Sequence, residues 1–173
     1  MLSSLAALSY APPQPNAAAW AVIQKQFSAV TIGLAFTDDK TGYTSFTDGA
    51  SAPVITKTVD GGATWSNSSL LHIQTTFCEG SIVGTAGGRL LISAPSTSNG
   101  GRANISVFAS ATGDGGGGVP TFAPLTTLYE GSSAYSSMLP PASGGADYLN
   151  LYEREGSKFL TLARFQFDEG GGS

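Results

Sequence analysis

The stretch that most constrains the fold is a tight turn between strand-like residues, Thr58-Val-Asp60-Gly-Gly62-Ala-Thr-Trp65. The Asp60 carboxylate can accept backbone N–H bonds across such a turn. Gly62 can adopt the left-handed conformation that reverses the chain. We expect Trp65 to re-enter the sheet and pack between neighbouring strands. An ordinary Asp-Gly hairpin is the alternative, but Thr58 and Trp65 favour the Asp-box pattern, which is structural and not catalytic.

Strand signals continue along the rest of the chain. Short apolar or alternating segments are separated by clusters of glycine, serine and aspartate, and the chain has 23 glycines and only 12% charged residues. This composition is typical of short strands joined by turns. The strand-like segments are 31–36, 43–47, 54–58, 146–152 and 159–165. Because no segment carries a sustained helical period, the sequence predicts an all-β fold.

A second, degraded copy of the turn follows around Asp114. Repeats of about 50 residues are typical of propeller blades of four strands. We therefore expect a partial β-propeller of about three four-stranded antiparallel blades. The expected organisation is an irregular N-terminal arm, three blades and a Gly/Ser tail, at residues 1–19, 20–68, 77–127, 128–168 and 169–173.

Charge and composition exclude several classes of function. The net charge of −4 and the pI near 4.7 argue against nucleic acid as a partner. No apolar run reaches the ~18 residues of a membrane span. A single cysteine, Cys78, and a single histidine, His72, make neither a disulfide nor a credible zinc site. Cys78 lies in an apolar pattern and is expected to be a small buried hydrophobe. We expect no metal and no cofactor.

Five short blocks follow one another in the second half of the chain. They are Cys78 to Val83, Gly88 to Pro95, Arg102 to Val107, Gly131 to Ser136 and Leu151 to Glu153. Their order resembles the C-terminal part of the exo-sialidase family, whose fold is a six-bladed propeller. The resemblance implies a retaining glycosidase that removes terminal sialic acid from glycoconjugates. Its partners would be sialylated glycans or other carbohydrates.

The same resemblance implies roles for four residues. Tyr135 matches the catalytic nucleophile, and Arg102 matches one of three arginines that bind the sialic acid carboxylate. Glu153 matches an acid that orients another of these arginines. Glu79 would line the pocket by analogy, without being the activating base. The alternative interpretations are a surface tyrosine on a loop or strand end, a solvated arginine and exposed carboxylates.

The sequence departs from the family pattern in its arginines. All four of them lie at residue 89 or later, and the first family arginine, the general-acid aspartate and the activating glutamate have no counterparts. We therefore expect a fragment or decayed relative that is inactive alone, with further blades from a homodimer or another chain. A first blade at 20–68 also resembles Asp-box repeats of photosystem assembly factors of the Ycf48 kind. A non-catalytic propeller that binds glycan or protein, and an assembly factor, stay open as alternatives. The sequons at Asn67 and Asn104 are meaningful only if the protein is secreted. A secreted or lumenal location is the expectation.

Overall fold

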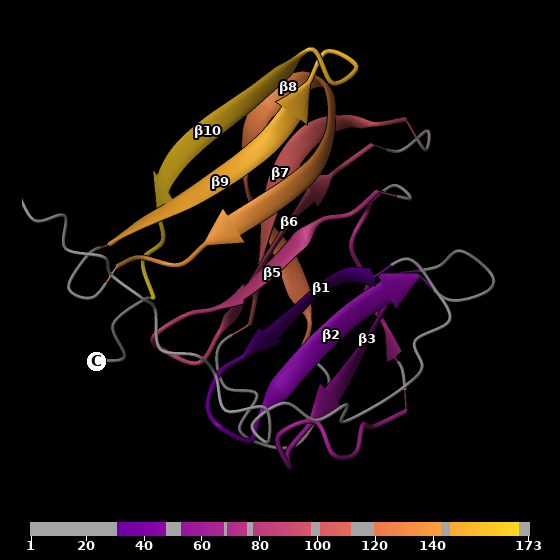
Figure 1. The fold of residues 1–173 in the computed structure, drawn as a ribbon, viewed down its shortest axis with the longest axis vertical. Coiled ribbons are helices and arrows are strands. Elements are labelled where there is room, and N and C mark those ends of the chain that lie inside the picture. The colour runs from indigo at the N-terminus through magenta and orange to yellow at the C-terminus, as the bar shows by residue number, and fades with distance from the viewer. Residues whose placement is uncertain are drawn as a thin grey trace, which may run out of the picture.

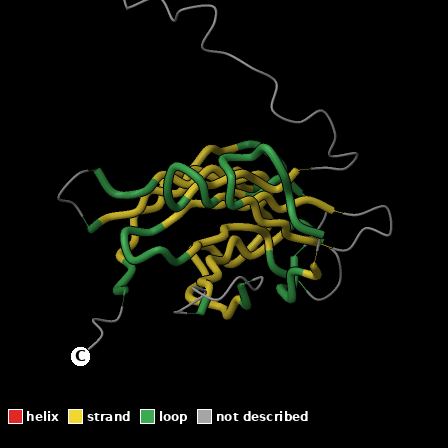
Figure 2. The backbone as a smooth tube through the Cα atoms, turned by 90° about the horizontal axis from the view of Figure 1, so that it is seen from below, coloured by secondary structure: helices red, strands yellow, loops and turns green. Residues whose placement is uncertain are grey.

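The structure is a computed structural model that shows an all-β protein (Figures 1 and 2). The described part of the chain forms ten strands and no helix, and these strands make two antiparallel sheets. No helix among these residues is long and apolar enough to cross a membrane. The expected all-β class is confirmed. The residues described are 31–47, 53–67, 69–75, 78–97, 101–111, 120–142 and 146–169.

The first sheet has four strands in sequence order, each paired with the next. They are β1 (Thr31–Phe36), β2 (Gly42–Thr47), β3 (Pro53–Thr58) and β4 (Ser69–Leu70). The turn between β1 and β2 forms because the Asp38 carboxylate accepts N–H bonds from Lys40 and Thr41 at 2.8 and 2.7 Å. This is the local side-chain bonding that favours aspartate in turns.

The second sheet has six strands and curls, in the order β10-β9-β8-β7-β6-β5. Its members are β5 (Ser81–Gly84), β6 (Leu90–Pro95), β7 (Ala103–Ser110), β8 (Phe122–Leu139), β9 (Asp147–Arg154) and β10 (Phe159–Gln166). In Figure 1, β8 bends as it passes from β7 to β9.

The 18-residue strand β8 belongs to two parts of this sheet. Its first half pairs with β7 and its second half pairs with β9, and the register shifts between them. Gly131 lies at the change with φ 141°, and its N–H donates to the Asn104 side-chain oxygen at 3.0 Å. Strands β5 to β8 thus form a four-stranded group, and the end of β8 with β9 and β10 forms a three-stranded group.

The sheets meet where β1 approaches β5. A Cβ added to Gly33 would lie 2.8 Å from Ile82 Cγ2 and 3.0 Å from the Ile82 backbone nitrogen. The contact continues into a buried apolar cluster that joins the two sheets, formed by Ala35, Tyr43, Ile55, Leu71, Ile82, Leu90, Ile92 and Ala94. A second cluster fills the curl of the large sheet, with Val83, Leu91, Val107, Ala109, Met138 and Tyr148.

The turn after β3 has the bonds expected for its aspartate. The Asp60 carboxylate accepts hydrogen bonds from the Thr58 hydroxyl at 2.8 Å and from the Thr64 N–H and hydroxyl at 2.8 and 2.6 Å. The Gly62 N–H donates to the Thr58 hydroxyl oxygen at 2.9 Å, and Gly62 has φ 92°. The bonds from Thr64, then that from Thr58, lower the pKa of Asp60 to about 2.

Trp65 is half-buried and lines a pocket, and its expected packing between strands stays a prediction. Strand β4 pairs only with Val54 and Ile55, while Lys57 is bonded to Ser66, the residue after Trp65. The expected arm 1–19, the second turn at Asp114 and residues 170–173 of the tail lie outside the described residues. The blade boundaries stay a prediction, and β8 runs through the expected boundary at 127 and 128.

The close approach at Gly33 predicts a loss of stability in Gly33→Val. The new side chain meets the backbone of β5 as well as Ile82, and overpacking of this kind costs about 1–3 kcal/mol. Urea unfolding followed by circular dichroism measures the midpoint. The matched control is Leu34→Val, at an exposed position of the same strand, which should stay within about 0.5 kcal/mol. Equal midpoints for both variants would contradict the close approach.

The Asp60 turn predicts a pH-dependent contribution to stability. Its folded pKa of about 2 lies below the ordinary value of 3.8, so the ionised carboxylate favours the folded state above pH 3.8. This contribution is lost as the pH falls from 3.8 towards 2. The urea midpoint of the wild type should therefore exceed that of Asp60→Asn at pH 6, and the difference should shrink below pH 4. A difference that does not change with pH would rule out the ionised carboxylate as its source.

Candidate functional site

Tyr135 is presented by an irregularity in β8. Ser133 pairs with Arg154 and Ser136 pairs with Tyr152, so two residues of β8 face a single residue of β9. This is the geometry of a β-bulge, which redirects side chains next to functional sites. The Tyr135 side chain is 39% exposed, while its neighbour Ala134 is buried. Tyr135 was expected on a loop or at a strand end, but it lies at a bulge within the continuous strand β8.

Arg102 contacts the exposed face and hydroxyl of Tyr135. Its Nη1 donates to the Tyr135 hydroxyl at 3.3 Å, and its guanidinium carbon lies 5.2 Å from the ring centroid. The backbone brings them together, because the Ser133 N–H donates to the Arg102 carbonyl at 3.0 Å. The hydrogen bond to Tyr135 is the largest cause that raises the pKa of Arg102, which therefore stays cationic. We call these two residues the Arg102–Tyr135 pair.

The other three arginines, all of them described residues, are engaged elsewhere. Arg89 donates to the Ser110 carbonyl, with Nε at 2.8 Å. Arg154 lies over the Tyr129 ring, 4.8 Å from its centroid. Arg164 forms an exposed ion pair with Asp147 at 3.6 Å. Arg102 differs from them because its partner is an exposed hydroxyl, which an incoming anion can share or displace.

Cys78 and Glu79 lie beside the pair. The Ser136 N–H donates to the Glu79 carbonyl at 3.2 Å, which places this segment along β8. Cys78 is only 3% exposed, so its expected burial is confirmed. Burial raises the pKa of the Cys78 thiol, although the nearby Arg102 charge opposes the shift. The thiol is therefore protonated and buried, which is unsuited to nucleophilic catalysis.

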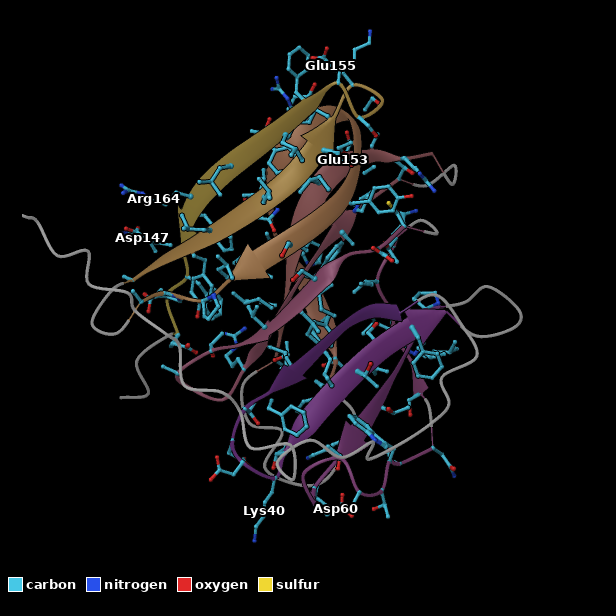
Figure 3. The ribbon with its side chains drawn as sticks, viewed as in Figure 1. Lys40, Asp60, Asp147, Glu153, Glu155 and Arg164 are labelled. Atoms are coloured by element: carbon cyan, nitrogen blue, oxygen red, sulfur yellow. The ribbon has the colours of Figure 1, made fainter. Side chains whose placement is uncertain are left out.

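Glu153 lies on the strand next to Tyr135, near the β9–β10 turn (Figure 3). Its carboxylate accepts a hydrogen bond from the Ser157 hydroxyl at 2.5 Å. Its negative charge contributes to raising the pKa of Arg102. The bond to Ser157 holds the carboxylate in the hairpin turn. The expected role of orienting an arginine stays a prediction.

A shallow pocket of about 240 Å³ brings together three of the predicted residues, Tyr135, Glu79 and Glu153. It is lined by Tyr135 and by Glu79, Ser136, Ser137, Leu151, Tyr152, Glu153 and Leu160. Arg102 is not part of the lining, but it donates a hydrogen bond to the Tyr135 hydroxyl. Together with Arg102, the pocket residues therefore supply one guanidinium, the phenols of Tyr135 and Tyr152, and two carboxylates. A guanidinium binds carboxylates through paired N–H donors, so this arrangement can bind an anionic group against Tyr135.

A buried polar network supports the strand that carries Tyr135. The Ser136 hydroxyl donates to the Ser93 carbonyl at 3.0 Å, and the Ser93 hydroxyl donates to the Asn150 side-chain oxygen at 2.9 Å. Asn150 has no exposed surface. These hydrogen bonds were not predicted from the sequence. The one feature that could have indicated them is the presence of polar residues at strand positions that face inward.

The Asp60 turn and the candidate site lie at opposite ends of the protein. Figure 3 shows Asp60 at the end where the four-stranded sheet lies, and Glu153 at the other end, close to the turn between β9 and β10. The turn residues Thr58, Asp60, Gly62 and Trp65 therefore take no part in the pocket beside Tyr135. The structural role expected for the turn stays a prediction.

Comparisons with known proteins give a match at the level of the fold. No protein-family model matches the sequence, and no curated protein matches it. Among solved structures, a leech intramolecular trans-sialidase in complex with 2,7-anhydro-Neu5Ac is similar at 18% identity and TM-score 0.61, over 77% of this chain and 23% of that one. A K499G mutant of the NanB sialidase from Streptococcus pneumoniae matches at 17% identity and TM-score 0.59, over 78% and 22%.

A Hadza microbial sialidase matches at 23% identity and TM-score 0.56, over 77% of this chain and 26% of that one. The chain therefore spans about a quarter of the length of these sialidases. Sialidases of this kind are β-propellers, so the all-β fold described above is similar to one part of a sialidase propeller.

The burial of Cys78 predicts slow reaction with a thiol reagent. In the folded protein at pH 8, the rate should be on the order of 10²-fold lower than in urea, because the thiol becomes accessible only when the structure opens. The chain has one cysteine, so the absorbance of the released thiolate reports Cys78 alone. Similar rates in buffer and in urea would show that the thiol is accessible.

Proposed function

We propose that the Arg102–Tyr135 pair is part of a sialidase-type site that binds the terminal sialic acid of glycoconjugates. In this proposal Arg102 binds the sugar carboxylate and Tyr135 is the nucleophile. The observation that carries it is the 3.3 Å hydrogen bond between the Arg102 guanidinium and the exposed Tyr135 hydroxyl. The similarity to sialidase folds supports it at the level of architecture.

The chemistry of sialic acid favours this combination. Its carboxylate is attached to the anomeric carbon, where it would repel an anionic nucleophile. A tyrosine approaches as a neutral group, and sialidases are an exception to the two-carboxylate scheme of glycosidases. A guanidinium next to the phenol would hold the carboxylate while the phenol oxygen faces the anomeric carbon.

The proposed reaction needs two proton transfers. The Tyr135 oxygen forms a bond to the anomeric carbon as the bond to the leaving oxygen breaks, and a base takes the phenol proton while an acid protonates the leaving group. Water then cleaves the glycosyl–tyrosine bond. Arg102 donates to the phenol and cannot serve as the base. The general-acid aspartate and the activating glutamate of the family have no counterparts in the sequence, and a single preorganised group commonly contributes on the order of 10²–10³ in rate. We therefore expect binding without enzyme-like turnover.

The alternative is a non-catalytic propeller that uses the same pair to bind a glycan or an acidic protein segment. The Glu153 carboxylate favours this alternative, because it accepts a hydrogen bond from Ser157 in the hairpin turn. In the sialidase-type site it would instead orient an arginine. Both functions need Arg102 to contact an anion, but only catalysis needs the Tyr135 hydroxyl to react. The resemblance to assembly factors stays a prediction based on sequence.

Binding of N-acetylneuraminic acid tests the proposal. Saturation-transfer NMR should detect binding to the wild type, and Arg102→Ala should weaken it about tenfold or more, since a hydrogen bond to a charged group contributes about 1.5–3 kcal/mol. Arg164→Ala is the matched control, because its ion pair with Asp147 is exposed and lies outside the pocket. Equal loss in both variants, or none in Arg102→Ala, would overturn the proposed role of Arg102.

Turnover of a fluorogenic sialoside separates binding from catalysis. We expect no enzyme-like rate for the chain alone, and Tyr135→Phe should bind the free sugar nearly as well as the wild type. Clear turnover that Tyr135→Phe abolishes would support the nucleophile and refute the expected inactivity. Turnover that persists in Tyr135→Phe would refute the nucleophile.

A further inference from the structure

A second pocket lies at the edge of the four-stranded sheet. Its volume is about 610 Å³, within the roughly 300–1,000 Å³ that is typical of small-molecule sites. Its lining consists of one aromatic residue, one aliphatic residue, one cation and four small polar residues, namely Trp65, Val59, Lys57, Thr64, Ser66, Asn67 and Ser69. The function proposed above does not use this pocket.

Backbone bonds hold the wall of this pocket in place. The Ser66 N–H donates to the Lys57 carbonyl at 2.8 Å, and the Lys57 N–H donates to the Ser66 hydroxyl oxygen at 3.0 Å. Thr64 is fixed by its two bonds to the Asp60 carboxylate. Trp65 lies between these two anchored residues. The pocket is therefore largely formed before any ligand binds, which lowers the entropic cost of binding.

The chemistry of the lining suits a sugar. A half-buried indole offers a flat apolar surface, against which the C–H face of a pyranose can pack. The Thr64 hydroxyl is bonded to Asp60 and the Ser66 hydroxyl to the Lys57 N–H and the Asn67 carbonyl. The Asn67 and Ser69 side chains are therefore the lining groups that we expect to bond the hydroxyl groups of a sugar. Lys57 carries the only formal charge among the lining residues. Asp60 is outside the lining, and its carboxylate is bound to Thr58 and Thr64.

We propose that this pocket is a second saccharide-binding site, with Trp65 as the stacking surface and Lys57 as the residue that selects a carboxylate-bearing sugar. It lies by the Asp60 turn, at the opposite end of the protein from Glu153 (Figure 3), which lines the pocket beside Tyr135. The two sites cannot share one sugar ring. A glycan that reaches both, or two glycans on one surface, would gain avidity from the second contact.

Tryptophan fluorescence tests the second site. The chain has two tryptophans, so a Trp20→Phe background leaves Trp65 as the only reporter. The probes are 3′-sialyllactose, a hyaluronan tetrasaccharide and neutral lactose. We expect both acidic probes to change the Trp65 emission and to bind about two- to fivefold more tightly than lactose, the range expected for an exposed charge pair. No change with any probe would overturn the proposal.

Two variants identify the residues responsible. In the same background, Lys57→Gln should lower the affinity for the acidic probes to that for lactose, while Arg102→Ala should leave the Trp65 response unchanged. Loss of the response in Arg102→Ala would mean that the signal comes from the site beside Tyr135 and would refute a second site. Retained acid preference in Lys57→Gln would refute the role of Lys57.

Amide NMR shifts provide a readout that does not depend on tryptophan. On adding 3′-sialyllactose to the wild type, the N–H signals of Ser66, Asn67 and Ser69 should move, and these movements should be lost in Trp65→Phe if its spectrum elsewhere shows a folded protein. Movements that persist unchanged in folded Trp65→Phe, or that avoid these three residues, would contradict stacking on Trp65.

Discussion

The pairing of β8 with strands on both of its halves is the constraint on which the larger sheet and the candidate site depend. One continuous strand bonds first to β7 and then to β9, so the two groups of strands cannot move independently without breaking it. The change of partner requires local irregularity, and the bulge before Ser136 supplies part of it. That irregularity turns Tyr135 outward towards Arg102, while Ser136 bonds inward to Ser93.

Local patterns in the sequence predicted much of the first sheet and of the β9–β10 hairpin. The segment 31–36 is β1, and the turn at Asp38 forms by side-chain bonds to residues two and three positions later. Such features depend on neighbours in the chain. The short pairing of β4 with Val54 and Ile55 and the hydrogen bond between Asn150 and Ser93, 57 residues away, depend instead on the folded chain. Neither distant contact leaves a local pattern.

Family resemblance, and not periodicity, suggested that Arg102 and Tyr135 belong to one site. They are 33 residues apart, and the bond between the Ser133 N–H and the Arg102 carbonyl that joins their segments is a tertiary contact. The resemblance placed Glu153 nearby and did not foresee its bond to Ser157. The sequence therefore predicts only part of the candidate site. The resemblance suggests which residues belong to it, but the folded backbone determines which of their atoms come into contact.

Strand β10 borders the large sheet, with Leu160 and Leu162 at 71% and 61% exposure. A sheet edge offers N–H and C=O groups to any strand that comes alongside, and exposed leucines add apolar surface to the contact. If a strand of a second chain paired with this edge, the fraction of paired chains would rise with protein concentration, and the measured stability and ligand affinity would then depend on that concentration.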